Sequence, residues 1–333
     1  MDTVKVIFTQ PGVAQLQTRQ LPPVTGDLVL VRTAYTVVSG GTERAYLLGM
    51  PNTRQVFPTA IGYCGIGYVE QVGEEVKDLT PGDRVLVYHG GHSQYSVVSQ
   101  SRLTKIENPQ IDTLDAAFTV IASMGLGGVR RLELELGESA MVMGLGLLGM
   151  FSLQFCHLSG ANPVIAADLD PTRRALAMEL GADYALDPAE ENFVAKVLEI
   201  TGGKGIRGTV EVTGASQAMQ QALACASRQG RISLLGCTRV SDCSVDYYAQ
   251  VHKPGVKLIG AHNMVRPQVD SYPHCWTHHD DCRAILGLLG AGKMKVAPIR
   301  SRVVSAAQAP EIYAQLATDP HFPLGTVFDW SAL

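Results

Sequence analysis

The clearest indication of chemistry in this chain comes from three glycines within six residues. Gly144, Gly146 and Gly149, with Leu147 and Leu148 between the last two, form a Gly-x-Gly-x-x-Gly turn between an apolar run of strand length and an apolar segment of helix length. In such a unit the first glycine makes the tight turn, the second lets backbone approach a pyrophosphate, and the third lets helix and strand pack closely. The helix then directs unpaired N–H groups and its positive dipole end at the phosphates. Alone the motif is weak, because a chain with 34 glycines also uses such sequences as plain turns.

A carboxylate at a suitable distance strengthens this interpretation. Residues 163–167 are typical of a second strand, and Asp168 follows them, 168 − 149 = 19 positions after Gly149. A dinucleotide-binding fold needs an acceptor for the adenosine ribose hydroxyls about 20 residues after the glycines. The two features together predict a nicotinamide dinucleotide site.

The same carboxylate bears on the choice of cofactor. Asp168 would repel a 2′-phosphate, so NAD(H) is favoured over NADP(H). Arg173 and Arg174 leave NADP(H) open, since arginines there could hold that phosphate. Their alternative role is that of solvent-facing helix residues after an Asp170 cap. Leu169 and Arg173 are therefore included in the predicted cofactor site.

The elements that must position this site alternate regularly. Strands are expected at residues 140–143, 163–167, 183–186, 208–212, 231–235 and 256–259, and helices at 114–131, 171–180, 189–200 and 217–226. This α/β pattern predicts a Rossmann-type, doubly wound parallel sheet of six strands. Ligands of such sheets lie beyond the carboxyl ends of the strands. Besides Gly144 and Asp168, those ends are Thr213, Gly236, Cys237 and Ala261, which complete the predicted cofactor site.

The rest of the chain has another character. Residues 1–115 contain many short strand-like runs separated by turn signals such as Pro11-Gly12 and Pro81-Gly82-Asp83, which predicts a β-rich domain. The tail from residue 267 offers one clear helix, 280–290, and a strand at 326–329, and is too small to be a domain. We therefore expect one domain from residues 1–115 and 267–333, with a dinucleotide domain, 116–266, inserted in it.

Composition restricts the partners. The net charge of −4, the pI near 6.1 and the lack of a Lys/Arg run argue against nucleic acid or an anionic membrane, so a small molecule is the expected partner. The N-terminus lacks a signal-peptide core, and no stretch is long and apolar enough to span a bilayer, so a cytoplasmic location is expected. The 7 scattered cysteines, without a CxxC pair, suit reduced structural thiols.

Five segments together resemble a known family over the whole chain. They are Gly41-Thr42-Glu43, residues 61–70 (IGYCGIGYVE), residues 81–85 (PGDRV), the glycine turn, and residues 179–183 (ELGAD). The chain resembles the medium-chain dehydrogenase/reductase superfamily, in its zinc alcohol and polyol dehydrogenase branch. The resemblance implies a GroES-like β-rich catalytic lobe, a Rossmann lobe and hydride transfer to or from a nicotinamide ring. It also implies a homodimer or homotetramer, commonly formed through the strand at 256–259.

The sequence departs from this family at its metal sites. Where zinc members have a cysteine, a histidine and a further cysteine or glutamate, this chain has Ser39 or Gly40, Tyr63 and Val120. Catalytic zinc takes three protein ligands, and here only Cys64 is available. The four-cysteine structural zinc loop is missing too. We therefore expect no zinc; the Ser-x-Gly-Thr-Glu segment looks like that of metal-free members such as the bacteriochlorophyllide dehydrogenases.

Without zinc, other groups must move the alcohol proton. Tyr63 matches the family's ligand histidine and is the predicted proton donor, unless it only fills the volume left by the metal. Thr42 matches a hydroxyl that contacts the substrate, or else is a turn threonine. His92 is the predicted proton shuttle, or else a solvated loop histidine. Ser39 and Glu43 are assigned to substrate binding.

A histidine-rich cluster marks the tail. Residues 272–282 read YPHCWTHHDDC, and metal binding is one interpretation, but His278 and His279 are adjacent rather than one helical turn apart. We favour a substrate-specificity loop in which Trp276 and His278 stack on and hydrogen-bond to a polyhydroxy or ring substrate.

Three functions follow. The first is a zinc-independent oxidoreductase that transfers hydride between NAD(H) and a secondary alcohol or ketone, such as a sugar, polyol or cyclic alcohol. The second is an enoyl or quinone reductase of the same fold, which Gly41-Thr42-Glu43 disfavours. The third is an inactive NAD(H)-binding sensor, which would bind NADH tightly without turnover.

Overall fold

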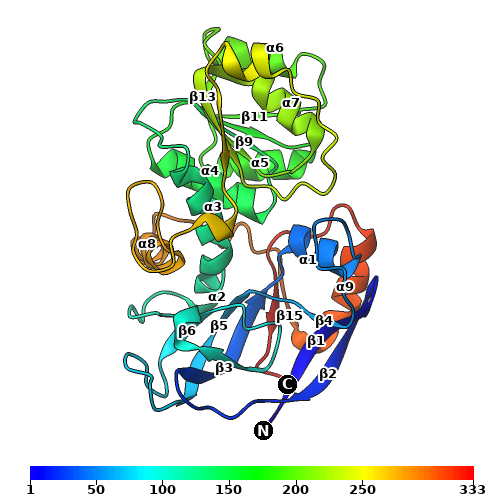
Figure 1. Ribbon diagram of the computed structural model, residues 1–333, viewed down its shortest axis with the longest axis vertical. Coiled ribbons are helices and arrows are strands. Elements are labelled where there is room, and N and C mark those ends of the chain that lie inside the picture. Colours follow the sequence, from blue (N-terminus) through cyan, green and yellow to red (C-terminus); the bar gives the residue numbers. More distant parts are fainter. The chain divides into compact units, whose positions relative to one another are not determined.

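The computed structural model describes residues 1–333, which form two compact units (Figure 1). Met1–Ile121 and Cys282–Leu333 make one, the β-rich unit, and Ala122–Asp281 make the other, the α/β unit. The chain thus leaves the β-rich unit and returns to it. We expected the two boundaries after residues 115 and 266. In the structure the chain passes from one unit to the other at residues 121–122 and 281–282. Both positions lie inside helices, where no turn sequence marks a boundary. The functional roles given to the two domains stay predictions.

The α/β unit is built on one parallel sheet. Its six strands run in the order β11-β10-β9-β12-β13-β14. They are β9 (Ala140–Met143), β10 (Val164–Ala167), β11 (Tyr184–Leu186), β12 (Ile206–Glu211), β13 (Ala226–Leu234) and β14 (Lys257–Gly260). All strands are parallel, but successive strands are added outward from β9 on one side and then from β12 on the other, so the strand order reverses between β9 and β12, as in a doubly wound fold. The predicted parallel six-stranded sheet is confirmed.

Helices cover both faces of this sheet. α4 (Leu147–Leu158) and α5 (Pro171–Glu179) pack on β9, β10 and β11, and α7 (Ser216–Cys225) packs on β12 and β13 beside α6 (Phe193–Ile200). Alternate residues of the strands point to opposite faces. Met141, Met143 and Ile165 accordingly share one buried cluster with Phe193 and Val197 of α6.

Two predicted helices differ from the observed ones. The expected helix 114–131 is two helices, α2 (Thr113–Ala116) and α3 (Thr119–Arg130), because the N–H of Phe118 bonds to the carbonyl of Asp115, three residues back, which tightens and ends the first. The expected helix 189–200 begins only at Phe193, because turns of the same kind occupy the residues before it.

The β-rich unit contains two sheets, which are antiparallel apart from one parallel strand pair, and two covering helices. The larger sheet is ordered β15-β16-β3-β5-β6-β8, with β7 also paired to β3, and the smaller is β2-β1-β4. Their bounds are β1 (Asp2–Gln10), β2 (Val13–Gln20), β3 (Leu28–Val37), β4 (Thr59–Ala60), β5 (Cys64–Val72), β6 (Arg84–Tyr88), β7 (Tyr95–Ser99), β8 (Leu103–Lys105), β15 (Arg302–Ser305) and β16 (Thr326–Asp329). The helices are α1 (Gly40–Leu47) and α9 (Ala309–Thr318). The pairing of β16 with β3 ties the tail to the N-terminal segment.

The tail holds more structure than the sequence indicated. Besides α8 (His278–Gly290) and β16 it contains β15 and the helix α9, both of which the sequence reasoning missed. Pro310 lies in the first turn of α9. Proline is tolerated there, because the N–H that it lacks would have no acceptor within the helix. Tyr313 and Leu316 of α9 pack with Phe8 and Trp330 in the main core of the unit. None of the helices is both long and apolar enough to cross a bilayer.

Candidate active site

The glycine turn has the geometry of a phosphate cradle. Gly144 has φ +92°, in the left-handed region that favours glycine. A Cβ on Gly149 would overlap the carbonyl oxygen of Gly144, so only glycine lets α4 start this close to β9. A Cβ on Gly146, in contrast, would meet nothing within 4 Å, which leaves open space in front of that backbone. Each glycine thus has the backbone geometry that its predicted role requires.

The start of α4 leaves donors free for an anion. The helix begins at Leu147, and its N-cap, Gly146, has no side chain to satisfy the first N–H groups. The N–H of Leu148 belongs to the same first turn, where intrahelical acceptors are lacking. These donors together with the dipole end suit a pyrophosphate.

Asp168 closes the cradle from the end of β10. Its Oδ2 accepts from the N–H of Leu145 at 2.6 Å, and its Oδ1 accepts from the N–H of Asp170 at 2.8 Å. A carboxylate has about four lone-pair positions, so two stay available for ribose hydroxyls. The residues therefore fit NAD(H).

The two arginines beyond Asp168 are not equivalent. The Nη1 of Arg174 donates to the carbonyl of Asp168 at 2.7 Å and to the Oδ2 of Asp187 at 3.1 Å, so this nitrogen is already engaged. Arg173 lies only loosely at 3.8 Å from the Oδ2 of Asp170. Leu169, which lies between Asp168 and these arginines in the sequence, is 67% exposed. Arg173 is thus the residue that keeps NADP(H) open.

A buried acid that the sequence reasoning missed orders the next strand end. Glu211, 3% exposed at the end of β12, accepts from the N–H of Thr213 at 2.7 Å, from the hydroxyl of Thr213, and from the N–H of Gly214 at 3.1 Å. Burial raises the pKa of Glu211, and these hydrogen bonds oppose the rise. Its signal was an acid inside an apolar strand.

The remaining predicted cofactor residues follow β13 and β14. Gly236 packs its backbone on the loop after β12, where a Cβ would come within 2.5 Å of the Gly214 nitrogen. Cys237 is exposed, and Ala261 is buried. Thr213, Gly236 and Cys237 thus lie on adjoining loops, while Ala261 lies at the end of the edge strand.

In the β-rich unit, three hydroxyl side chains meet at the start of α1. Ser39 is the N-cap of α1, and its side chain does not cap the helix. The phenol of Tyr63 instead donates to the Ser39 Oγ, and Thr42 also lies in hydrogen-bonding range of the phenol oxygen. Burial raises the pKa of Tyr63 well above its usual value, with further rises from Cys64 and Glu43, while the two hydroxyls lower it. Tyr63 is therefore a protonated phenol at neutral pH.

Glu43 lies deeper than its predicted substrate-binding role requires. It is 0% exposed, and its carboxylate accepts from the N–H of Ser39 at 3.0 Å, from the phenol of Tyr313 at 2.6 Å and from His92 at 3.1 Å. Burial and the Glu43 charge raise the pKa of Tyr313, so this phenol stays a donor. The carboxylate is satisfied inside the protein and holds Ser39 in place.

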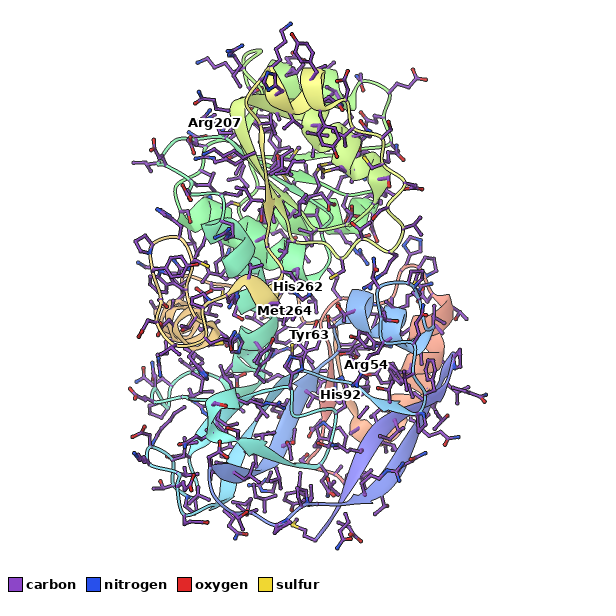
Figure 2. The ribbon with its side chains drawn as sticks, viewed as in Figure 1. Arg54, Tyr63, His92, Arg207, His262 and Met264 are labelled. Carbon is purple, nitrogen blue, oxygen red and sulfur yellow. The ribbon has the colours of Figure 1, made fainter.

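His92 is an interior residue rather than a solvated loop histidine. It is 0% exposed, and its Nδ1 lies 2.7 Å from the Oγ1 of Thr36, which accepts from the Trp330 indole at 2.9 Å. The Nε2 of His92 donates to the Glu43 carboxylate, because a carboxylate only accepts. Figure 2 labels His92 and Tyr63, both in this unit.

The comparisons with known proteins agree with both units. Residues 25–108 match the alcohol dehydrogenase GroES-like domain, and residues 148–272 match the zinc-binding dehydrogenase family. The chain belongs to the medium-chain dehydrogenase/reductase superfamily. Its fold is that of the superfamily too: galactitol-1-phosphate dehydrogenase from Escherichia coli superimposes with a TM-score of 0.85 at 18% identity, over 98% of this chain and 99% of that one.

Curated relatives of this superfamily member are dehydrogenases. L-Threonine 3-dehydrogenase of Pyrococcus horikoshii is 29% identical over 265 residues, covering 70% of this chain and 75% of the relative. D-Guloside 3-dehydrogenase of Escherichia coli K12 is 26% identical over 257 residues, covering 77% of this chain and 73% of the relative. This superfamily member is accordingly an oxidoreductase of the dehydrogenase type.

The zinc that the name of the matched zinc-binding dehydrogenase family implies does not fit the residues present. The Ser39 hydroxyl is engaged by Tyr63, Tyr63 is a protonated phenol, and Val120 is a fully buried hydrocarbon. Cys64 is the one soft ligand at these positions, and catalytic zinc takes three protein ligands. The side chains form no group of three His, Cys, Asp or Glu arranged to hold a metal.

The predicted specificity residues of the tail lie in the α/β unit, not with the rest of the tail. The guanidinium of Arg130 stacks 3.6 Å from the centroid of the Trp276 ring, and the Nδ1 of His278 lies 3.2 Å from the Ser123 hydroxyl. One face of Trp276 is therefore occupied by Arg130, and both residues anchor the segment to α3. Their assignment to substrate binding stays a prediction.

Proposed function

We propose that this protein interconverts a secondary alcohol and a ketone, with NAD(H) as hydride carrier and without zinc. The observation that carries the proposal is the cluster of Ser39, Thr42 and Tyr63, a buried phenol with two hydroxyl neighbours at the positions where the resemblance places the metal site. A hydride carrier alone does not complete the reaction, because the alcohol oxygen must also gain or lose a proton.

The chemistry divides between the two units. Oxidised nicotinamide, when bound, accepts the hydride from the carbinol carbon at its C4. The α/β unit supplies the cradle for the cofactor, with Gly146 open to the pyrophosphate and Asp168 available to the ribose. The β-rich unit supplies the proton. In reduction the Tyr63 phenol donates its proton to the alkoxide oxygen that hydride addition creates, and a proton from water, relayed by the hydroxyls of Ser39 and Thr42, restores the phenol.

The buried Glu43 serves this proton chemistry indirectly. It holds the Ser39 backbone at 3.0 Å, so the hydroxyl of Ser39 is placed for the phenol. The network from Trp330 through Thr36 and His92 fixes the carboxylate in turn. We therefore treat Glu43 and His92 as positioning residues, in place of the substrate-binding and proton-shuttle roles expected from the sequence.

Two features support NAD(H) and a polar secondary alcohol. Asp168 places negative charge where a 2′-phosphate would lie, and Arg174 is already paired with Asp187. The names of the relatives point to hydroxyl groups within amino acids and sugars. We infer a sugar, polyol or cyclic alcohol as the substrate.

The assembly proposed with this function is a homodimer or homotetramer in the cytoplasm. β14 pairs with β13 on one side and with no strand on the other. An open strand edge is a ready template for a second copy.

An assay on metal-free protein tests the proposal. The purified chain is dialysed against a chelator, its metal content is measured, and NADH oxidation is followed with a panel of ketones, then NAD⁺ reduction with the matching alcohols. Turnover that survives chelation supports the proposal. Loss of activity on chelation with recovery on adding zinc contradicts it.

The panel also separates the rival functions. Reduction of a carbon–carbon double bond in an enone, without ketone reduction, indicates the enoyl or quinone reductase. Tight NADH binding without turnover on any substrate indicates the sensor. NADPH in a parallel series decides the cofactor preference.

A further inference from the structure

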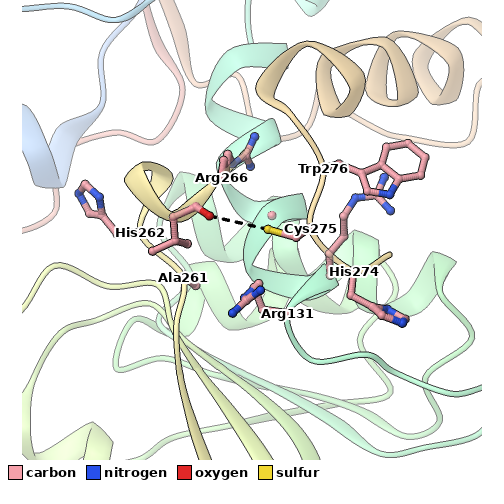
Figure 3. Close-up of a pocket in the computed structure, with 10 residues that line it drawn as sticks. Arg131, Ala261, His262, Arg266, His274, Cys275 and Trp276 are labelled. Atoms are coloured by element: carbon pink, nitrogen blue, oxygen red, sulfur yellow. Dashed lines mark hydrogen bonds between the residues drawn. The ribbon is translucent and has the colours of Figure 1, made fainter. Parts of the chain in front are cut away.

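A strongly basic pocket lies in the α/β unit, apart from the glycine turn. Figure 3 shows it between α3 and the segment that follows β14. Five basic side chains line it: Arg130, Arg131, His262, Arg266 and His274. Its lining also includes Ala261 and Trp276, which belong to the predicted cofactor and substrate sites, but its basic side chains have no role in the proposed reaction.

The positive charge in this pocket exceeds the negative charge near it. Asp281 is fully buried beside it and pairs with Arg130 at 2.6 Å and with Arg266 at 3.3 Å. One carboxylate thus faces two guanidiniums, and Arg131 adds a third. Concentrating like charge in a partly desolvated place is unfavourable unless an anion offsets it.

Two of the three arginines are held rigidly. Arg130 lies against the Trp276 ring while bonded to Asp281. Arg266, whose side chain is 9% exposed, also donates to the carbonyl of Ser123. A Cβ on Gly127 would overlap the Arg266 guanidinium, so α3 carries a glycine where this arginine passes. These two side chains form a fixed basic wall.

Arg131 differs from the other two arginines because no carboxylate pairs with its guanidinium. Its buried Nε has no hydrogen-bond partner, and neither has the buried Nη1 of Arg266. Buried polar groups without a partner are rare in native proteins and each calls for an explanation. A ligand oxygen would satisfy this donor.

We propose that this pocket binds an oxyanion group, a phosphate or carboxylate of a small molecule, with Arg131 as its principal donor. The enclosed space is about 10 Å³, which is room for roughly one water-sized atom. One oxygen of the anion enters it, and the rest of the group lies at the mouth, near His274. The planar guanidinium fork suits both phosphate and carboxylate oxygens.

The anion has two possible sources with the same chemistry. It is either a charged group on the substrate, since Ala261 and His262 of the pocket stand at the end of β14, or a separate small anion. The evidence for the site is the set of arginines, not the proposed reaction, so the site can be tested independently of that reaction.

Calorimetric titration of the full chain with inorganic phosphate, with and without saturating NADH, tests the site. The Arg131→Ala variant is expected to bind phosphate at least about tenfold more weakly, a loss of about 1.4 kcal/mol. The matched control Arg228→Ala removes an exposed arginine of the same unit and is expected to leave binding unchanged. Arg131→Gln is a second variant in case Arg131→Ala does not fold, and urea unfolding checks both.

Three results would overturn the proposal. They are wild-type phosphate affinity in Arg131→Ala and Arg131→Gln, equal weakening in Arg228→Ala, and loss of phosphate binding with NADH, which would place the ion at the glycine turn. Failure of NADH to bind would count against the proposed function alone.

A kinetic comparison identifies the source of the anion. With a polyol phosphate and the matching neutral polyol as substrates, a rise in KM of tenfold or more for the phosphate ester alone in Arg131→Ala places the anion on the substrate. Unchanged KM values together with lost phosphate binding indicate a separate anion. Both results support the site.

Discussion

The glycine turn of the α/β unit and the Glu43 network of the β-rich unit are two ways to build a site. The turn is made of backbone from consecutive residues, and its only chemical demand is the absence of side chains at Gly144, Gly146 and Gly149. The network is made of side chains from segments far apart in the chain, such as Glu43 and Tyr313. The glycine turn should therefore tolerate substitutions of the side chains around it. In the Glu43 network each side chain depends on the others, so the loss of one affects them all.

The largest expected effect is on the hydroxyl cluster that the network supports. Tyr63→Phe removes the proton donor and keeps the ring, so turnover should fall by about 10²–10⁴-fold, the usual contribution of general acid–base catalysis. The affinity for NADH, measured by fluorescence, should stay within about twofold, since Tyr63 belongs to the other unit.

The control for this variant is Tyr46→Phe, which removes a half-buried phenol of α1 that packs against the core cluster of Phe8 and Trp330. Turnover in Tyr63→Phe equal to that in Tyr46→Phe would leave Tyr63 with a packing role only.

The second effect breaks the turn instead. Gly149→Ala places a methyl group against the Gly144 carbonyl, so the first turn of α4 must shift and its donors lose their aim. NADH affinity should fall about 100-fold, or about 2.7 kcal/mol, in a fluorescence titration. Gly287→Ala in α8 is the matched control, because its Cβ meets nothing within 4 Å. Equal NADH affinity in the two variants would remove the turn from the cofactor site.

This contrast also explains what the sequence could predict. The turn, Asp168 and the six parallel strands follow from local patterns, because each is determined within one strand–turn–helix unit. Asp168 was located by the strand before it and by its spacing from the glycines. The helix α9 escaped prediction; Pro310 stands in its first turn, where proline is tolerated.

The network could not be predicted, because its members share no local pattern. The bond between Tyr313 and Glu43 joins residues 270 positions apart, and the bond between Trp330 and Thr36 joins residues 294 apart. Without the fold, Glu43 was interpreted as a substrate ligand and His92 as a proton shuttle. Glu211 was missed although an acid in an apolar strand was a signal that the sequence offered.

A third prediction concerns the stability that Glu43 provides. Glu43→Gln replaces one acceptor oxygen by an NH₂ group, which faces donors and leaves at least one of them unpaired. Urea unfolding should show a loss of about 2 kcal/mol, since bonds to a charged acceptor contribute about 1.5–3 kcal/mol.

The control for Glu43 is Glu70→Gln. Glu70 pairs with Arg32 at 2.7 Å, but both side chains are largely exposed, at 41% and 49%. An exposed pair contributes about 0–1 kcal/mol. If the two variants lost the same stability, the network would have no special part in holding the β-rich unit.

The smallest expected effect is a pH dependence that the buried phenol creates. Burial raises the pKa of Tyr63 well above 10, so in the folded protein the phenol keeps its proton while the unfolded chain loses it near pH 10. The unfolded state then binds fewer protons, so the stability that this phenol contributes is fully present below about pH 10 and falls above it, by about 1.4 kcal/mol per pH unit.

Cys156 and Cys225, with pKa values raised to about 12 by burial, add a similar fall in stability that starts near pH 8.5 in the α/β unit. Urea unfolding from pH 8 to about pH 11 should therefore show a decline that begins with the thiols and steepens near pH 10. Tyr63→Phe should remove about half of the steeper part, because the buried phenol of Tyr313, whose pKa is raised as well, supplies the other half. Tyr247→Phe, at a ring 70% exposed, should leave it unchanged. A steep part as large in Tyr63→Phe as in the unchanged protein would show that this phenol is not held protonated by the fold, and the proton donor of the proposed reaction would have to be sought elsewhere in the cluster.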